Sequence, residues 1–298
     1  MTISKTNPDF MIIGAPKAGT TSLAAWLGEH PVVFMSDPKE PAHFSTDIQT
    51  LGAIRDSAAY DVLFAGAALD QRSGEASTMY LRSRVAVPAV LARRPDTRLI
   101  VCLRNPVEMM PSVHGQLLRG GREILGNPKE AWAAQEARRQ GRGLPQFCPE
   151  PADLDYAASC ALGAQVGRLL DVACRDQVHF IFNEDMRADP GAVYRDALAF
   201  LDVLDDGRTD FAALNQRSLS RSNTLSQFLA RASALRRRVW HGGSSLSLGA
   251  LAARLNTSSA AAPTTTSYEF RTCLAAHFAD DIETLAALTG RDLSEWLT

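Results

Sequence analysis

Four short runs of apolar residues stand out along the chain, at 10–13, 32–35, 99–103 and 178–182. Runs of this length with little polar alternation are typical of strands that are buried on both faces, as in parallel sheets. Between them, other apolar residues recur every three or four positions, which predicts amphipathic helices. This alternation predicts an α/β fold with a mostly parallel sheet of about four or five strands, flanked by helices.

The predicted helices vary in length along the chain. They cover 23–27, 57–64, 106–118, 129–140, 154–174, 190–201 and 270–288. Residues 74–77 predict a strand end or a turn that leads into a further helix reaching 90–91. Pro106 suits the first turn of its helix, because proline lacks the N–H that is unpaired there.

Composition and charge narrow the classes of protein to consider. The 298 residues are 46% hydrophobic and 21% charged, with a formal net charge of -2. This balance gives no support to general nucleic-acid or membrane-surface binding, so any basic site must be local. The N-terminus has no apolar signal core and no later run is long enough to span a bilayer, so we expect a cytoplasmic protein. The five cysteines lack close pairs, which favours reduced thiols over disulfides or zinc ligands.

The stretch 14–21 reads Gly-Ala-Pro-Lys-Ala-Gly-Thr-Thr and lies between the first predicted strand and the first predicted helix. In such a loop, backbone N–H groups converge on a phosphate, and the helix adds the positive end of its dipole. Two glycines separated by four residues match the phosphate-loop pattern, but Thr20 stands where the usual lysine would follow. Lys17, inside the loop, keeps that charge within reach of an anion. The alternative is a Gly/Pro turn capped by threonine, with a solvated lysine.

A second candidate anion site follows the strand that Arg98 and Arg104 frame. Arg104 lies at its carboxyl end, and Ser112 lies in the second turn of the helix that Pro106 opens. The guanidinium, by a charge-assisted fork, and the hydroxyl, by a single hydrogen bond, would together hold one phosphate. Alternatively, Arg104 pairs with a surface carboxylate and Ser112 faces solvent.

A candidate proton acceptor lies just after the second predicted strand. Two prolines bracket Lys39 and Glu40 on a stiff connection, at the edge where α/β folds place ligand-binding groups. Glu40 is therefore a candidate general base, unless it forms only a solvated charge pair with Lys39. His43 is a second candidate, although a lone histidine among Pro, Ala and Phe residues is more often packed. Glu75, farther along, either faces the site or caps a helix.

Charged residues later in the chain allow two interpretations. Arg217 and Arg221 belong to a local basic region that extends to residue 238. This region either closes over a polyanionic ligand or forms a solvated helix face. Glu184 and Asp185 follow the strand at 178–182 and are expected to orient loop residues rather than to do chemistry.

Taken together, these motifs resemble the sulfotransferases that use 3′-phosphoadenosine 5′-phosphosulfate (PAPS) as sulfuryl donor, in particular bacterial members related to Golgi-type carbohydrate sulfotransferases. Residues 16–21 match the family's 5′-phosphosulfate loop, 104–112 its 3′-phosphate motif, and 39–41 the segment that carries the base in many bacterial members. Further matches lie at 74–77, 184–185 and 290–296. The resemblance to the family is weakest over the stretches 117–151 and 236–266.

The resemblance implies that a sulfuryl group passes from PAPS to a hydroxyl or amine, leaving the desulfated nucleotide, PAP. Lys17 would neutralise the charge that grows on the leaving phosphate, and Glu40 or His43 would take the acceptor's proton. The implied donor-binding residues are Pro16, Lys17, Ala18, Gly19, Thr20, Thr21, Ser22, Arg104 and Ser112, with Arg217 and Arg221 as further candidates. This scheme requires no metal.

The resemblance also implies a single domain over 1–298, with an α/β nucleotide-binding core at 9–202 and a mainly helical region at 203–298 that covers the site. The acceptor stays open between a small molecule, a glycan and a lipid, and the sequence does not specify the oligomeric state. Arginine-rich patches suit an anionic sugar, whereas apolar residues at 144–147 suit a lipid or polyketide-like alcohol. Ala76 stands where carbohydrate-modifying animal relatives commonly place lysine, which weakens the inference of a glycosaminoglycan acceptor.

Two other functions use the same loop. A P-loop kinase or NTPase would need a lysine after Gly19 and a carboxylate that holds magnesium; the lysine is missing and no such carboxylate is evident. A nucleotide-binding protein without catalysis would keep the anion sites and lose the base or the acceptor pocket. The presence of both Lys17 and Glu40 argues against that loss.

Overall fold

The computed structural model describes residues 7–212, 219–220, 257–258 and 267–297. The chain divides into two compact units. The first unit combines Met1–Asn105, Ala161–Asn215 and Phe278–Leu297, and the second combines Pro106–Cys160, Gln216–His277 and Thr298.

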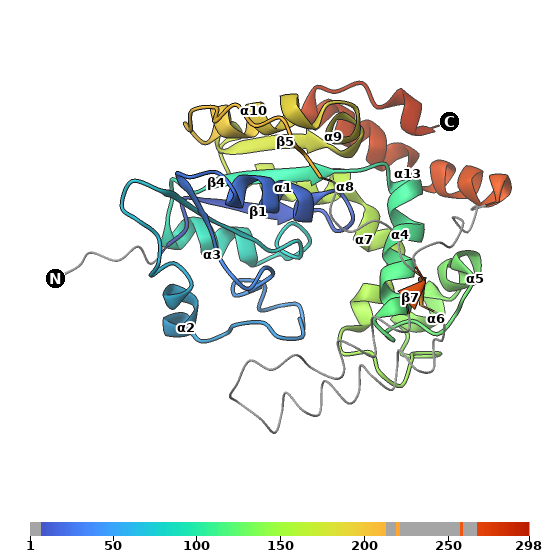
Figure 1. The fold of residues 1–298 in the computed structure, drawn as a ribbon. Helices are drawn as coiled ribbons and strands as arrows, with labels where there is room; N and C mark the ends of the chain where they lie inside the picture. The colour runs from blue at the N-terminus through green and yellow to red at the C-terminus, as the bar shows by residue number, and fades with distance from the viewer. Residues whose placement is uncertain (1–6, 213–218, 221–256, 259–266, 298) are drawn as a thin grey trace. The chain divides into compact units, whose positions relative to one another are not determined.

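A five-stranded parallel sheet runs through the first unit (Figure 1). Its strands are β1 (Phe10–Gly14), β2 (Val33–Met35), β3 (Arg72–Ala76), β4 (Arg98–Leu103) and β5 (Val178–Phe182). The spatial order is β2-β3-β1-β4-β5, and all neighbours are parallel. β1 lies in the middle and is buried along its whole length. The structure therefore confirms the predicted α/β fold, including a strand at each of the four apolar runs.

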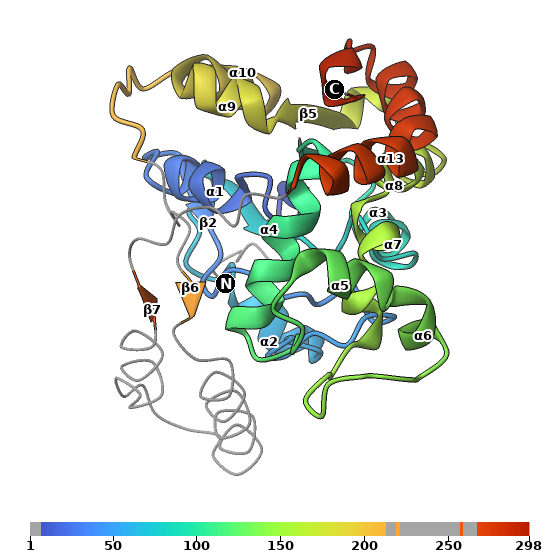
Figure 2. The ribbon, with the colours of Figure 1, turned by 90° about the vertical axis from the view of Figure 1, so that its right-hand side faces the viewer.

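Helices cover both faces of this sheet (Figure 2). α1 (Thr20–Gly28) connects β1 to β2, and α3 (Ala86–Arg93) connects β3 to β4. These crossovers lead in opposite directions along the sheet, so their common right-handedness places them on opposite faces. α10 (Pro190–Phe200) packs against α1, and α8 (Leu162–Leu170) lies beside α3. The remaining elements are α2 (Ser57–Val62), α9 (Asn183–Ala188), η2 (Arg175–Gln177) and η3 (Ser294–Leu297).

The second unit is mainly helical in its described part. It contains α4 (Pro106–Arg119), α5 (Pro128–Ala133), α6 (Gln135–Arg139), η1 (Pro151–Leu154), α7 (Tyr156–Cys160) and the short antiparallel pair β6 (Leu219–Ser220) and β7 (Thr257–Ser258). A buried ion pair joins Arg138 to Glu123 at 2.6 and 2.8 Å, and the Tyr156 hydroxyl donates to Glu123 at 2.7 Å. Arg138 and this hydroxyl lower the pKa of Glu123 against the opposing effect of burial. α13 (Tyr268–Thr289) runs from the second unit into the first.

One long predicted helix, at 154–174, is interrupted. Ala161 leaves the helical conformation, with φ -74° and ψ 76°. The Asp281 carboxylate accepts hydrogen bonds from the N–H groups of Gly163 and Ala164, each at 2.8 Å. These bonds supply the partners that the first turn of a helix lacks, so α8 begins anew after Ala161.

Other differences from the predicted helices are smaller. The segment predicted as one helix at 129–140 forms the two short helices α5 and α6. The chain turns after β3, and the next helix, α3, begins only at Ala86. The helices predicted near 106–118, 190–201 and 270–288 are present as α4, α10 and α13.

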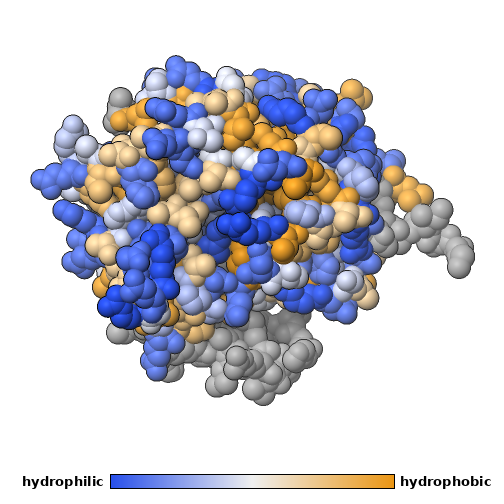
Figure 3. All heavy atoms as spheres, turned by 180° about the vertical axis from the view of Figure 1, so that it is seen from behind, coloured by the Kyte–Doolittle hydropathy of each residue, from blue (hydrophilic) through white to orange (hydrophobic). Residues whose placement is uncertain are grey.

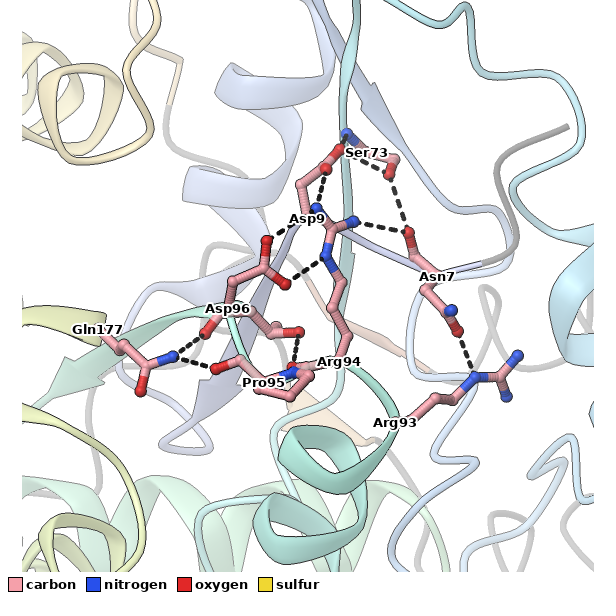
Figure 4. A network of polar contacts seen from close by, with 9 residues as sticks. Asn7, Asp9, Ser73, Arg93, Arg94, Pro95, Asp96 and Gln177 are labelled. Atoms are coloured by element: carbon pink, nitrogen blue, oxygen red, sulfur yellow. Dashed lines mark hydrogen bonds and ion pairs between the residues drawn. The ribbon is translucent and has the colours of Figure 1, made fainter. Parts of the chain in front are cut away.

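Polar side chains at the amino-terminal edge of the sheet are bonded to one another (Figure 4). Asp9, which precedes β1, accepts hydrogen bonds from the Ser73 N–H at 2.7 Å and from the Ser73 hydroxyl at 2.9 Å. Arg94 forms ion pairs with Asp9 at 2.8 Å and with Asp96 at 3.0 Å. These contacts fix the start of β1 against β3 and against the turn before β4.

Hydrophobic residues are exposed at several points of the surface, and on the face drawn in Figure 3 they lie between hydrophilic ones. Exposed apolar residues are ordinary on protein surfaces. Of the described helices, none combines the length and apolar character that crossing a bilayer requires.

Candidate functional site

The loop between β1 and α1 follows an unusual backbone course. Lys17 and Gly19 both have left-handed conformations, with φ of 65° and 99°. The Ala15 N–H donates to the Cys102 carbonyl oxygen at 2.6 Å, which ties the loop to β4. A left-handed residue other than glycine costs about 1–3 kcal/mol and is found mostly where function requires it. The strain at Lys17 therefore marks this loop as a candidate site.

Glycine suits position 19 because its φ of 99° is one that other residues rarely adopt; a Cβ atom there would also lie 2.4 Å from the Met186 sulfur, so that flexible side chain would have to move. Gly19 is also the N-cap residue of α1, and no side chain caps this helix. The first-turn N–H groups of Thr20 and Thr21 therefore suit an anion, which would also meet the positive end of the helix dipole. The side chains of Thr20 and Ser22 are buried, and that of Thr21 is half-buried.

Arg104 directly follows β4 and contacts the same loop. Its guanidinium Nη1 donates to the Lys17 carbonyl oxygen at 2.9 Å, and the side chain is only 6% exposed. Guanidinium groups of this kind bind phosphate groups well, because their N–H groups form a planar fork. The structure thus brings Lys17 and Arg104 together at the carboxyl edge of the sheet. Of the other loop residues, Pro16 is half-buried and Ala18 is buried.

Ser112 lies in the second turn of α4, as predicted, and its side chain is half-buried. α4 belongs to the second unit, whereas Arg104 belongs to the first. The binding of one phosphate group by both Arg104 and Ser112 therefore stays a prediction. Arg217 and Arg221 lie outside the described residues.

Glu40 lies at the carboxyl end of β3, the neighbour of β1. Its N–H donates to the Ala76 carbonyl oxygen at 2.9 Å. Its carboxylate accepts from the Thr78 N–H at 2.8 Å and from the Thr78 hydroxyl at 3.1 Å, and it pairs with Lys39 at 2.6 Å. The side chain is 33% exposed. Glu40 is therefore held at the same edge of the sheet as the loop of Lys17, with part of its surface open to solvent.

The segment that carries Glu40 also contains residues with left-handed backbone conformations, with φ of 62° at Glu40 and 50° at Ala42. Arg55 stabilises it by donating to the carbonyl oxygens of residues 42, 43, 45 and 48 at 2.7 to 3.0 Å. No pattern in the sequence points to Arg55. An arginine with no motif around it carries no local signal, since its carbonyl partners become neighbours only in the folded chain.

His43 is packed among aromatic rings. Its ring stacks on Tyr60, with centroids 4.4 Å apart, and the side chain is buried. Nδ1 lies 2.7 Å from the Ile54 carbonyl oxygen. Because a carbonyl oxygen only accepts, Nδ1 carries a proton. The structure therefore shows the packed arrangement that the sequence left open, and a base role for His43 stays a prediction.

Glu75 lies in β3 and is fully buried. Neither carboxyl oxygen has a hydrogen bond of normal geometry within the described residues, so Glu75 does not cap a helix. Burial raises the pKa of Glu75 to about 8, an increase to which the Glu40 carboxylate adds and which the hydroxyls of Tyr80, Tyr60 and Ser77 oppose. Glu75 thus combines full burial with closeness to the candidate base.

Glu184 and Asp185 contact the C-terminal segment. The Trp296 Nε1–H donates to the Glu184 carboxylate at 3.0 Å, and Arg291 pairs with Asp185 at 2.7 Å. These acidic residues therefore have structural partners. Within the ranges that the structure describes, no three His, Cys, Asp or Glu side chains are placed to hold a metal ion.

The sequence matches the sulfotransferase domain family over residues 7–227, which is most of the chain. The chain belongs to the sulfotransferase family. The chain is similar to a solved sulfotransferase from Alicyclobacillus acidocaldarius, with 29% identity and a TM-score of 0.73 over 98% of this chain and 99% of that chain.

Two further comparisons found similar proteins. The membrane-associated sulfotransferase kil1 of Dictyostelium discoideum is 29% identical over 101 residues, which cover 34% of this chain and 21% of that protein. The match thus spans about a fifth of the length of that relative. Mouse sulfotransferase SULT7A1, solved in complex with PAP, has 13% identity and a TM-score of 0.48 over 97% of this chain and 88% of that chain.

Proposed function

We propose that this protein transfers a sulfuryl group from PAPS to a hydroxyl or amine of a small-molecule, sugar or lipid acceptor. The observation that carries the proposal is the strained loop at the carboxyl edge of the sheet, where the Arg104 guanidinium meets the Lys17 carbonyl oxygen at 2.9 Å. Together with family membership, this arrangement favours a donor that carries several negative charges.

The loop residues are assigned to the 5′-phosphosulfate end of the donor. Lys17 and the first-turn N–H groups of α1 stabilise the charge that grows on the bridging oxygen as the sulfur–oxygen bond breaks. One preorganised donor of this kind is worth about 3–4 kcal/mol in the transition state. Arg104 holds the loop through the Lys17 carbonyl and, with Ser112, binds the 3′-phosphate.

Glu40 is assigned as the general base. The acceptor oxygen or nitrogen attacks the sulfur in line, its proton passes to the Glu40 carboxylate, and PAP leaves with the electron pair of the broken bond. Base catalysis of this type accelerates reactions by on the order of 100- to 10,000-fold. The Glu40 side chain is 33% exposed, which supports this assignment because a general base must be reached by the acceptor.

Calorimetric titration tests the donor site without knowledge of the acceptor. PAP and ATP–magnesium are each titrated into the wild type, into Arg104→Ala, and into Arg195→Ala, a control at an exposed position of α10. We expect PAP to bind without a metal to the wild type and the control, and to lose most of its affinity in Arg104→Ala. Binding of ATP–magnesium without binding of PAP would replace the proposal by a kinase or NTPase. PAP binding without any PAPS turnover on a panel of alcohols, sugars and amines would indicate a non-catalytic binding protein.

A further inference from the structure

The carboxylate of Glu40 accepts hydrogen bonds from two neighbouring residues. The Lys39 ammonium lies 2.6 Å from Oε1, and the Thr78 N–H donates to Oε2 at 2.8 Å. The Thr78 hydroxyl lies 3.1 Å from Oε1 and 3.2 Å from Oε2, so its one hydrogen serves either oxygen. A carboxylate has about four lone-pair positions. Within the described residues these three donors therefore leave one position of Glu40 for an incoming proton.

Thr78 belongs to a turn that is bonded to the end of β1. Before it, the Ser77 N–H donates to the Ile12 carbonyl oxygen at 3.0 Å. After it, the Leu81 N–H donates to the Ile13 carbonyl oxygen at 2.8 Å. Thr78 itself is only 9% exposed. Because β1 continues directly into the candidate donor loop, the same strand sets the positions of that loop and of Thr78.

The two neighbours of the Glu40 carboxylate differ in how firmly they can orient it. The Glu40 side chain is 33% exposed, and holding such a side chain in one direction costs conformational entropy. Lys39 is a point charge on a flexible, half-exposed stem, and pairs of this kind contribute little. Thr78 instead offers an N–H of the fixed backbone and a hydroxyl on a short, β-branched side chain. Thr78 is therefore the contact that sets the direction of the carboxylate.

We propose that Thr78 is a positioning residue for Glu40: its N–H and its hydroxyl together fix the orientation of the carboxylate relative to the loop that follows β1. The proposal rests on the proposed function, because it assigns a support to the base of that reaction. The acceptor's proton passes to the lone-pair position of Glu40 that Thr78 and Lys39 leave open. The Thr78 hydroxyl keeps its own proton throughout.

A double-mutant cycle in steady-state kinetics tests this role. Thr78→Val keeps the shape of the side chain and removes its hydroxyl. We expect kcat to fall about 10- to 100-fold with KM for PAPS unchanged, as for the loss of one hydrogen bond to a charged group. Thr78→Ser, which keeps the hydroxyl, should retain nearly the wild-type kcat. In the Glu40→Gln background, Thr78→Val should cause almost no further loss, because a positioning residue acts through the group that it positions.

The matched control for this cycle is Thr97→Val. Thr97 is a buried threonine at the amino edge of the sheet, and its hydroxyl donates to the Arg94 carbonyl oxygen at 2.9 Å. This variant therefore loses a hydrogen bond of its own away from the candidate site, and its kcat should be unchanged. An unchanged kcat in Thr78→Val, an equal loss in Thr97→Val, or the same loss with and without Glu40→Gln would overturn the proposal.

Amide hydrogen exchange in the full chain, followed by NMR, tests the same contact without turnover. In Glu40→Ala the Thr78 N–H loses its acceptor, so its exchange should accelerate about 10- to 100-fold. The Leu81 amide in the same turn is the internal control, because its acceptor is the Ile13 carbonyl oxygen, and its rate should not change. An unchanged rate at Thr78, or equal acceleration at both amides, would overturn the proposal even if Thr78→Val does not fold. Absence of PAPS turnover in the wild type would instead contradict the proposed function, so the two failures give different results.

Discussion

The two edges of the central sheet differ in the hydrogen bonding of their polar groups and in the conformation of their backbone. At the amino edge, Asp9, Ser73, Arg94 and Asp96 bond to one another at 2.7 to 3.0 Å (Figure 4). At the carboxyl edge, Lys17, Glu40 and Ala42 adopt left-handed backbone conformations, and Glu75 is buried without a normal hydrogen bond. At the amino edge these polar groups bond to one another, whereas the carboxyl edge keeps left-handed residues and a buried carboxyl group, features that cluster at functional sites.

From this contrast we propose that the residues of the amino edge stabilise the fold and that those of the carboxyl edge serve a ligand. Strain of about 1–3 kcal/mol at each left-handed residue persists only where the surrounding structure imposes it. Here Arg104 and Arg55 impose it, each by donating to backbone carbonyl oxygens of a strained segment. Replacement of a residue at the carboxyl edge should therefore affect turnover first, and replacement at the amino edge should affect stability first.

The largest effect is expected from Glu40→Gln. The amide keeps the shape of the side chain but cannot accept a proton, so kcat for sulfuryl transfer should fall by about 100- to 10,000-fold. PAP affinity should stay within a factor of about two, since the donor is assigned to other groups. Steady-state kinetics with PAPS and calorimetry with PAP measure the two quantities. A kcat equal to that of the wild type would remove Glu40 as the base, and His43→Gln would then be the next variant to test.

Lys17→Ala should have the next largest effect. We assign the Lys17 ammonium to the leaving phosphate, so its loss should lower kcat by about 100- to 1,000-fold, while PAP binding should weaken far less. The matched control is Lys129→Ala, because Lys129 is an exposed lysine of the second unit. Equal losses of turnover in both variants would show that Lys17 has no particular role.

The third effect concerns the pH dependence of stability. The pKa of Glu75 is about 8 in the folded chain, against 4.5 as its ordinary value. Between these values the folded state keeps a proton that the unfolded chain has lost, so the free energy of unfolding falls as pH rises, by up to about 1.4 kcal/mol per pH unit. Below pH 4.5 this stability is fully present. Denaturant titrations at a series of pH values should show that Glu75→Gln lacks this part of the slope; an unchanged slope would mean that Glu75 is not the titrating group.

The smallest effect on turnover is expected at the amino edge. Asp9→Asn removes the charge that faces Arg94 and should lower the free energy of unfolding by about 1–3 kcal/mol, as expected for loss of a partly buried charged hydrogen bond. kcat and PAP affinity should be unchanged. Urea titration measures the free energy of unfolding, and the kinetic assay measures kcat. A large loss of turnover without a loss of stability would contradict the proposal that the amino edge serves the fold and the carboxyl edge serves the reaction.

Much of the first unit follows from local sequence patterns. The apolar runs at 10–13 and 178–182 form β1 and β5, because buried parallel strands need continuous apolar residues. The loop residues Lys17 and Gly19 were recognisable because their chemistry depends on neighbours in sequence. The left-handed φ at Glu40 carried no such signal, because contacts from Thr78 and Arg55 fix it.

Residues whose role depends on distant partners were not predictable to the same degree. Ala161 interrupts a helix where Asp281, from the end of the chain, caps the next one. The sequence left two roles open for Glu75 because its buried surroundings come from α2, β3 and the turn after β3. A single sequence gives the periodicity of an element but not the long-range contacts that end it or bury a charge.

A crystal structure of the protein soaked with PAP would show which residues bind the donor. We expect the 5′-phosphate to lie in the loop of residues 15–20, within hydrogen-bond distance of Lys17 and the first-turn N–H groups of α1, with the 3′-phosphate on Arg104. PAP bound elsewhere, with this loop empty, would contradict the proposed donor site.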